Sequence, residues 1–420
     1  PQGMIMGELI MDDIAAKLGK DPLEIRKLNL YKKGRDTTPY HQTVEQHILK
    51  DMISQLEESG DYWARKKAIK AFNASSPIIK KGLAMTPVKY GISFTVQHLN
   101  QAGALVHVYS DGSIHLNHGG TEMGQGLNTK IAQIVAHGFG VDFDAVSISA
   151  TRTDKVPNTS PTAASSGTDL NGMAALNAVN TIKERLINFI SEHFEVDSQS
   201  IVFKDNLITF SKGEISFSEL ANLAYMNRIS LSSTGYYATP KIHYDRAKGE
   251  GRPFFYYAHG VALSEVEVDT LTGENTVTRV DILHDVGSSI NPALDIGQIE
   301  GAFVQGMGWL TTEDLQWNDK GQLASFGPAN YKIPAIGDTP AEFNVNLYNS
   351  ANPETTVFRS KAVGEPPFML AFSVWSAIRN AISSVADYKY TAPLDTPATP
   401  ERVLNAIEQT ASWFKEQQHG

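Results

Sequence analysis

The arrangement of apolar and polar residues changes from a helical to a strand-like period near residue 80. In residues 5–18, apolar side chains recur four or five positions apart, which predicts an amphipathic helix. Asp21 and Pro22 then mark the start of a second helix, and the charged stretch 50–72 predicts a third. We therefore predict that residues 1–75 form a helical segment.

Beyond that segment, two stretches alternate between apolar and polar residues on either side of a turn. GALVHVYSDGSIHLNHGG (103–120) alternates around Asp111-Gly112, a dipeptide that favours tight hairpin turns. GVALSEVEVDTLTGENTVTRVDILHDVG (260–287) alternates around residues 271–273. Both stretches predict antiparallel strand pairs.

Helical patterns are interleaved with these strands at irregular intervals. Residues 127–140 are amphipathic, residues 170–194 form the longest helical pattern, and residues 295–309 predict a further helix. Ser216 and Glu219 have the spacing of a capping box at a helix start. Because the spacing is not that of a regular βαβ repeat, we predict an α+β fold with mixed sheets, packed helices and two subdomains.

Length and charge limit the class of protein. A chain of 420 residues is too long for one ordinary core. Apolar runs stay shorter than the roughly 20 residues that a membrane-spanning helix needs, so we expect no membrane association. The net charge of -10 argues against a nucleic-acid partner, which requires a basic face. These observations favour a cytoplasmic enzyme or binding protein.

The sequence contains no cysteine, so disulfides, thiolate nucleophiles and cysteine-bound metal clusters are excluded within this chain. Any redox centre must be held by other groups. The histidines between residues 98 and 118 have strand spacing rather than the helical spacing of a metal site, so we predict no side-chain metal ligand. The start PQGMIM has no initiator methionine and no signal-peptide pattern, from which we expect a fragment of a longer protein.

Four segments combine small residues with a long polar side chain, and two of them are loops. In the first, Gln125 is placed in a turn of small residues, where a plain glycine-rich turn is the alternative. The second precedes the longest helix, so its backbone N–H groups would favour an anion, although a surface loop is the alternative. The four segments are GGTEMGQG (119–126), VPNTSPTAASSG (156–167), DIGQIEGAFVQGMGW (295–309) and VGEPPFML (363–370).

The helical segment 295–309 contains Gln305 among glycines at positions 301, 306 and 308. Each glycine inside a helix costs about 1 kcal/mol relative to alanine. Close approach to another part of the molecule is therefore a better explanation than an ordinary helix.

Glu365 stands between a glycine and two prolines, and two roles compete for it. An acidic residue beside a helix N-terminus is stabilised by the exposed backbone N–H groups, with proline in the first turn. Alternatively, Glu365 is a carboxylate held out of water so that it can accept a proton.

Read together, these segments resemble the molybdenum portion of the xanthine dehydrogenase and aldehyde oxidase family. The resemblance runs over nearly all of the chain and covers the C-terminal half of that portion. It is carried by PQGM, KYGISFTVQHLNQAGALVHVYSDGS, HGGTEMGQGL, VPNTSPTAASSGTDLNG, DVGSSINPALDIGQIEGAFVQG, YKIPA and SKAVGEPPFMLAFSVWSAIRNAI. It implies that residues 1–75 end the first molybdopterin-binding subdomain and that residues 76–420 form the second.

The resemblance implies a molybdopterin cofactor, with molybdenum near Ala164 and Glu365 but held by no protein side chain. Glu365 would be the general base, and Phe94 and Thr95 would line a purine pocket together with Ala163 and Ala164. The residues implied to bind the cofactor are Gly124, Gln125, Gly126, Ala163, Ala164, Ser165, Ser166 and Gln305.

The activity implied is oxidation of hypoxanthine and xanthine to urate. Electrons would pass to 2Fe-2S clusters, FAD and NAD, which other portions of the complete enzyme bind and this chain does not. The partners implied are the rest of the molybdenum subunit and the iron–sulfur and FAD portions, in a dimer of the complete unit. The alternatives are an aldehyde oxidase-type hydroxylase and a fragment that is catalytically inactive by itself.

Overall fold

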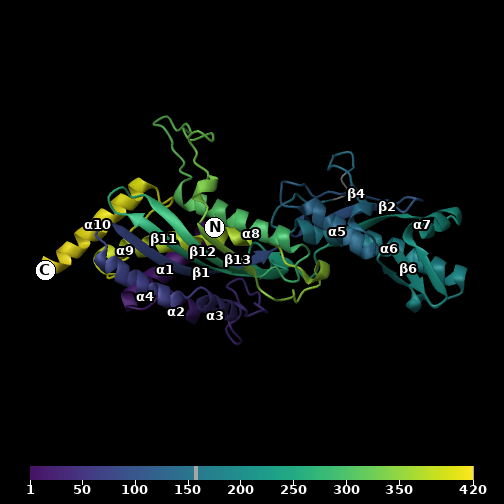
Figure 1. Ribbon diagram of the computed structural model, residues 1–420, viewed down its shortest axis with the longest axis horizontal. Helices are drawn as coiled ribbons and strands as arrows, with labels where there is room; N and C mark the ends of the chain where they lie inside the picture. The colour runs from purple at the N-terminus through teal and green to yellow at the C-terminus, as the bar shows by residue number, and fades with distance from the viewer. Residues whose placement is uncertain (156–158, 420) are drawn as a thin grey trace.

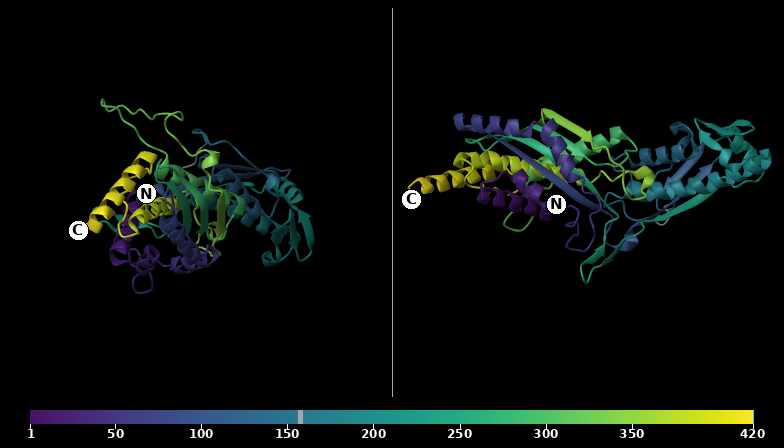
Figure 2. Two further views of the ribbon diagram at one scale, coloured as in Figure 1. Left: turned by 60° about the vertical axis from the view of Figure 1, so that its left-hand side comes forward. Right: turned by 90° about the horizontal axis from the view of Figure 1, so that it is seen from below.

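The computed structural model describes residues 1–155 and 159–419, which form an elongated molecule with a larger and a smaller body (Figure 1). Residues 101–155 and 159–238 form the smaller body, and both ends of the chain belong to the larger one. The view from below shows the two bodies following one another along the long axis (Figure 2). The chain thus enters the smaller body once and returns.

The larger body is built on one mixed four-stranded sheet in the order β1-β11-β12-β13. Strands β1 (Ile79–Ile92) and β11 (Tyr256–Asp269) pair antiparallel along their whole length. Strand β12 (Asn275–His284) continues the antiparallel arrangement, and β13 (Glu342–Leu347) joins β12 in parallel. The long β1–β11 ribbon carries its ends toward the smaller body (Figure 1).

Helices cover both faces of this sheet because successive strand residues point to opposite sides. Leu83 and Met85 of β1 pack with the N-terminal helices, whereas Ala84 and Val88 pack with the C-terminal ones. A side chain at Gly82 would collide with the backbone of α9 at Ala377, so glycine sets the closeness of that packing. The helices are α1 (Gln2–Leu18), α2 (Pro22–Asn29), α3 (Leu49–Ser59), α4 (Tyr62–Ser75), α8 (Pro292–Thr311), α9 (Phe372–Ser383) and α10 (Pro400–His419).

The smaller body has its own core. Its sheet has the order β4-β3-β2-β8, and the helices α5 (Leu127–Phe139) and α6 (Gly167–Phe194) pack together beside it. A three-stranded sheet, β5-β6-β7, and α7 (Phe217–Met226) complete it. The strands are β2 (Gln101–Val108), β3 (Ile114–His118), β4 (Val146–Ile148), β5 (Val202–Lys204), β6 (Leu207–Phe210), β7 (Gly213–Ser216) and β8 (Ser232–Ala238); β9 (His243–Asp245) and β10 (Glu250–Arg252) form a hairpin after it.

The predicted α+β class with mixed sheets is confirmed, as are both hairpins and the Ser216–Glu219 capping box. The third predicted helical stretch is two helices, α3 and α4, because Gly60 and Asp61 interrupt it. Residue 75 is not a break in packing, since Met52 of α3 and Leu83 of β1 share one core cluster. The assignment of 1–75 and 76–420 to two family subdomains stays a prediction.

The glycines of α8 explain how the segment around Glu365 is placed. A side chain at Gly306 would meet the carbonyl oxygen of Phe368 in the 3-10 helix η6 (Pro366–Ala371), and one at Gly308 would meet Pro334. Gly301 faces open space. The predicted close approach therefore exists at two of the three glycines, and the one at Gly306 places η6 against α8.

One helical stretch, Pro366–Ala386, is long and apolar enough to cross a membrane by composition. The protein itself buries 72% of its most apolar window. Its residues Leu370, Val374 and Ile378 belong to the main core cluster. The stretch is therefore the central core helix of the larger body.

Candidate functional site

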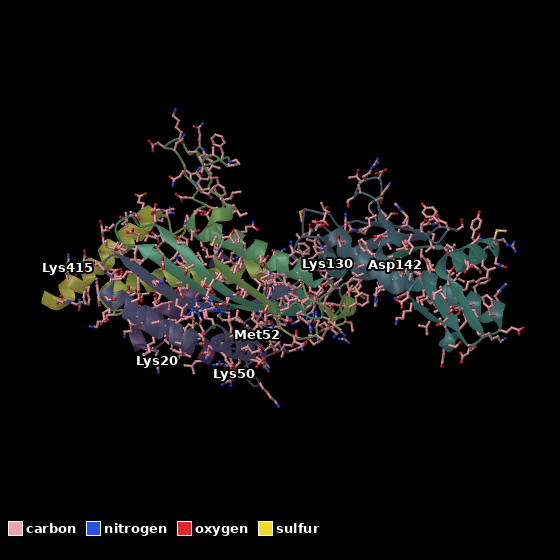
Figure 3. The ribbon with its side chains drawn as sticks, in the orientation of Figure 1. Lys20, Lys50, Met52, Lys130, Asp142 and Lys415 are labelled. Atoms are coloured by element: carbon pink, nitrogen blue, oxygen red, sulfur yellow. The ribbon has the colours of Figure 1, made fainter. Side chains whose placement is uncertain are left out.

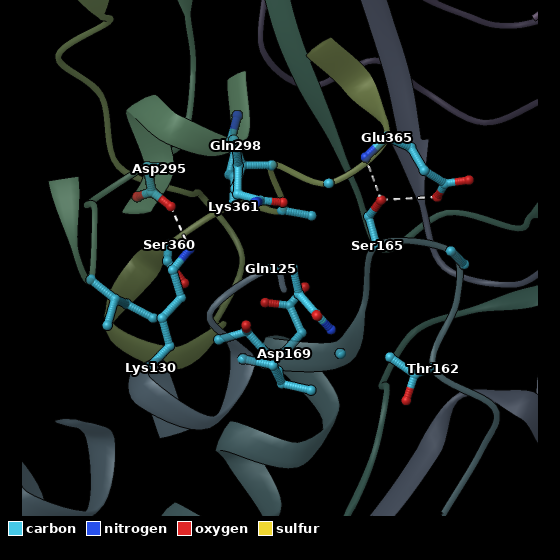
Figure 4. Close-up of a pocket in the computed structure, with 18 of the residues that line it drawn as sticks. Gln125, Lys130, Thr162, Ser165, Asp169, Asp295, Gln298, Ser360, Lys361 and Glu365 are labelled. Carbon is cyan, nitrogen blue, oxygen red and sulfur yellow. Dashed lines mark hydrogen bonds and ion pairs between the residues drawn. The ribbon is translucent and has the colours of Figure 1, made fainter. Parts of the chain in front are cut away.

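A cavity of about 320 Å³ lies where the two bodies meet. The smaller body contributes the loop before α5, residues 162–165 and the first turn of α6. The larger body contributes the first turns of α8 and residues 360–365, which precede η6 (Figure 4). Segments more than 200 residues apart in sequence, such as those at 125 and 365, thus line one cavity.

The Glu122 carboxylate holds the loop before α5 in a tight turn. Glu122 accepts hydrogen bonds from the backbone N–H groups of Gly124 at 2.9 Å and Gly126 at 3.0 Å. Both glycines have positive φ, 98° and 75°, which lets the chain turn this tightly. Between them, Gln125 lines the cavity and its side-chain Nε2 donates to the Thr121 carbonyl at 2.9 Å.

Two consecutive residues opposite this loop are in the left-handed region, Ala164 at φ 54° and Ser165 at φ 55°. Such φ values are uncommon for residues with a side chain and persist where the surroundings impose them. The constraint is visible at Ser165, whose Oγ donates to Oε2 of Glu365 at 2.9 Å and accepts from the Glu365 N–H at 2.7 Å (Figure 4). A side chain at Gly364 would come within 3.1 Å of the same Oγ.

Glu365 is the N-cap residue of η6, but its side chain makes no capping hydrogen bond. Its carboxylate is directed to Ser165 instead. The Tyr90 hydroxyl also lies beside it, and burial together with the Glu365 charge raises the pKa of Tyr90, so this phenol stays a donor. Glu365 is exposed, so the expectation that this carboxylate is held out of water is wrong for this structure.

A buried ion pair joins the two bodies at the cavity. Lys130 of α5 pairs with Asp295 of α8, and both side chains are nearly inaccessible to solvent. Ser289 donates to the second carboxylate oxygen. Figure 3 shows Lys130 at the junction and Asp142 farther into the smaller body. This pair fixes α5 against α8 on opposite sides of the cavity.

A second buried pair anchors the segment 360–365 through its residue Lys361. Lys361 donates to Oδ2 of Asp285 at 2.5 Å and to the Tyr257 carbonyl at 3.1 Å, and both charged side chains are fully inaccessible. Although burial opposes ionisation, His259 and Lys361 hold the pKa of Asp285 well below its usual range. Burial lowers the pKa of His259 to about 4, so His259 is neutral at physiological pH. Lys361 is therefore the cation that this carboxylate requires.

The structure brings together five of the predicted site residues: Gln125, Ala163, Ala164, Ser165 and Glu365 line the cavity. Gly124 and Gly126 flank Gln125, and Ser166 follows Ser165 as the buried residue before α6. Residues 156–158 of the second loop lie outside the described residues.

The other three predicted residues neither line this cavity nor adjoin a residue that does. Gln305 is exposed on α8, two helical turns beyond the part that faces the cavity. Phe94 and Thr95 follow the end of β1, where Asn100 holds the Phe94 backbone through hydrogen bonds of 2.8 and 2.9 Å. The roles predicted for these three residues stay predictions.

Gln298 lies in the cavity wall and was missed from the sequence. Among the described residues, its side-chain amide has no hydrogen-bond partner, so both its donor and its acceptor are free for a ligand. A local signal existed, because Gln298 follows Gly297 as Gln125 follows Gly124. Gln305, by contrast, is preceded by a valine.

A family model described as molybdopterin cofactor-binding domain matches residues 55–340. That range includes Gln125, Ala164 and Gln298. The chain belongs to this molybdopterin-binding family. The resemblance drawn from the sequence motifs is thereby confirmed.

Relatives of the molybdopterin-binding chain include xanthine dehydrogenase/oxidase of Gallus gallus, 49% identical over 98% of this chain. Xanthine dehydrogenase of Dictyostelium discoideum is 45% identical over 99% of it. The chain spans 29% and 30% of the length of these two relatives.

Solved structures show the same fold. The Cu,Mo-CO dehydrogenase aligns with a TM-score of 0.83 at 19% identity, over 96% of this chain and 51% of that one. The aldehyde oxidoreductase from Desulfovibrio desulfuricans aligns with a TM-score of 0.77 at 26% identity, over 96% of this chain and 40% of that one. The predicted fold type is thus confirmed.

The residues of the cavity fit a molybdopterin cofactor. Gln125 and Gln298 present amide groups, and the half-buried amide of Gln298, which makes no hydrogen bond among the described residues, is available to a ligand. The small side chains at 163 and 164 leave backbone groups accessible, and the N-terminus of α6 behind them favours a polyanion. The chain has no cysteine that could bind the metal as a thiolate.

Proposed function

We propose that this chain supplies one side of the molybdenum site of a hydroxylase that oxidises hypoxanthine and xanthine to urate. The observation that carries the proposal is the convergence of Glu365, Gln125, Gln298 and the 163–165 loop on one cavity. The relatives named xanthine dehydrogenase support the choice of purines over other substrates.

Gln125 and Gln298 would hold the cofactor from opposite walls, and backbone groups of 163–165 would contact it. When bound, the molybdenum centre supplies two-electron oxidation and an oxygen derived from water. Glu365 would accept the proton that this oxygen loses. Ser165 fixes one carboxylate oxygen, Oε2, by donating to it, and the remaining lone pairs of the carboxylate are left to take the proton.

The other parts of the proposal concern the complete protein. Phe94 and Thr95 would line the purine pocket, and electrons would leave through 2Fe-2S clusters and FAD to NAD in portions outside this chain. Exposed apolar side chains on α1, of which Met6 and Leu18 are 55% and 60% accessible, offer a surface for the rest of the molybdenum subunit. We expect a cytoplasmic enzyme that is a dimer of the complete unit.

Aldehyde oxidation is the second candidate, because the aldehyde oxidoreductase structure aligns over 96% of the chain. The relatives named xanthine dehydrogenase are more similar, at 45% and 49% identity against 26%. The isolated 420-residue chain, which spans about 30% of those relatives, is expected to be inactive by itself.

Two glutamines on one helix provide the test of this proposal. Gln298→Ala in the complete enzyme is expected to lower molybdopterin content per protein at least fivefold, because a cavity wall loses its free amide. Gln305→Ala is the matched comparison, because its side chain is exposed on the same helix away from the cavity. If Gln298 holds the cofactor in the place that the resemblance implies for Gln305, this variant should keep its cofactor content and its xanthine oxidation. Cofactor would be measured as its oxidised fluorescent pterin, and urate formation by absorbance.

Equal cofactor loss in both variants, or a loss confined to Gln305→Ala, would show that this cavity is not the cofactor site. A fully loaded parent enzyme that oxidises aldehydes but not xanthine would establish the second candidate instead.

A further inference from the structure

Tyr256, the first residue of β11, places its hydroxyl between Asp169 and Ala362, which line the cavity from the smaller and the larger body. It is 4% exposed. Its hydroxyl donates to Oδ2 of Asp169 at 2.7 Å and accepts from the backbone N–H of Ala362 at 2.8 Å. One phenol on the large sheet therefore connects the first turn of α6 to the segment that precedes η6.

The Ala362 N–H, the Tyr256 hydroxyl and the Asp169 carboxylate form a chain of two hydrogen bonds, which we call the relay. The chemistry of these groups fixes which of them donates. A backbone N–H can only donate, so the Tyr256 oxygen must accept from Ala362. The single phenol proton is then free for Asp169, which accepts it. Other groups that face Asp169 are Lys130 of α5 and Tyr237 of β8. Burial raises the pKa of Asp169 to about 7, although Tyr256 and Lys130 act to lower it.

Both ends of the relay lie beside the residues that carry the proposed chemistry. Asp169 follows Ser165 by four residues, and Ala362 precedes Glu365 by three residues. Ser165 and Glu365 are tied directly at the mouth of the cavity by two hydrogen bonds. The same two segments are thus joined twice, by a serine hydroxyl at the mouth and by a buried tyrosine hydroxyl behind it.

We propose that Tyr256 and Asp169 are positioning residues that set the place of Glu365 relative to the 163–166 loop. The inference rests on the proposed function in one respect, the role of Glu365 as base. If the hydrogen bonds with Ser165 were the only link, the exposed Glu365 carboxylate could move together with its loop. The second tie converts the two loops into one unit, so that cofactor contacts on one side and the base on the other keep a fixed separation.

The test uses Tyr256→Phe, which keeps the ring and removes the relay, and Tyr257→Phe as its matched control. The control residue is the next in β11 and is also buried. Its hydroxyl is hydrogen-bonded to the Tyr40 hydroxyl at 2.9 Å and not to either loop. Asp169→Ala removes the acceptor, whereas Asp169→Asn retains a carbonyl oxygen that the phenol can reach.

In the complete enzyme, molybdenum reduction by saturating xanthine would be measured in a single turnover and expressed per loaded metal. We expect at least a tenfold fall in Tyr256→Phe and Asp169→Ala with unchanged half-saturation, recovery to within threefold in Asp169→Asn, and the parent rate in Tyr257→Phe. Hydrogen exchange of peptides spanning 360–368 and 163–170 should accelerate in the first two variants and not in the control.

Rates within twofold of the parent in Tyr256→Phe would overturn the positioning role, whatever the exchange shows. The hydrogen-exchange measurement does not depend on the proposed function. It shows whether the relay stabilises the two loops even if xanthine does not reduce the parent enzyme. In that case, unchanged protection of both peptides in Tyr256→Phe would overturn the inference, and loss of protection in both would support the coupling of the loops.

Discussion

Glu365→Gln is expected to lower xanthine oxidation by the complete enzyme at least 100-fold. The amide keeps the size of the side chain and can still accept the Ser165 hydrogen bond of 2.9 Å, but it cannot take up a proton. A positioned general base typically contributes ~100-fold to ~10,000-fold. Steady-state urate formation, corrected for molybdenum content, measures the effect.

The alternative role of Glu365 at a helix start makes a different prediction. If the carboxylate only stabilised η6, its loss would cost at most about 1 kcal/mol of folding free energy and leave turnover nearly intact. The structure already weakens that role, because the side chain makes no capping hydrogen bond. If a Glu365→Gln enzyme with full molybdenum content turned over within tenfold of the parent, the helix-start role would be the better explanation. A tenfold change is only about 1.4 kcal/mol of barrier.

Lys361→Met is expected to lower the free energy of unfolding by about 3–5 kcal/mol. The substitution leaves Asp285 as a charge without its cation in a fully inaccessible place, because His259 is neutral at physiological pH. Chemical denaturation of this 420-residue chain would measure the loss.

The controls for that prediction isolate the buried charge. Lys248→Met removes an exposed lysine whose partner Asp245 is 3.8 Å away, and it should cost less than about 0.5 kcal/mol. Adding Asp285→Asn to Lys361→Met should recover part of the loss, because the unpaired charge is then gone. Equal costs for Lys361→Met and Lys248→Met would show that the buried pair contributes nothing.

Local signals were sufficient for much of the fold. Asp111-Gly112 predicted a hairpin because that dipeptide tolerates the positive φ of a tight turn, and Gly112 has φ 88°. The glycines at 306 and 308 predicted close packing because a helix seldom accepts them otherwise, and both contact other segments. Such inferences succeed because each depends on neighbouring residues alone.

The candidate site was predicted less completely, because its walls come together through long-range packing. Gln305 was chosen for its glycine neighbours, but Gln298, two turns nearer the start of α8, is the one that lies beside the loop before α5 and lines the cavity. No local pattern relates Lys361 to Asp285, which are 76 residues apart, or Tyr256 to Ala362, which are 106 apart. The exposure of Glu365 likewise depends on what covers its loop, which its own sequence does not encode.

The position of molybdenum in crystals of the complete enzyme tests the central claim most directly. Anomalous scattering at the molybdenum edge would locate the metal without assumptions about the protein. We predict one peak inside the cavity between Gln125 and Gln298, next to Ala164 and Glu365. A fully loaded enzyme whose molybdenum peak lies outside this cavity would contradict the account.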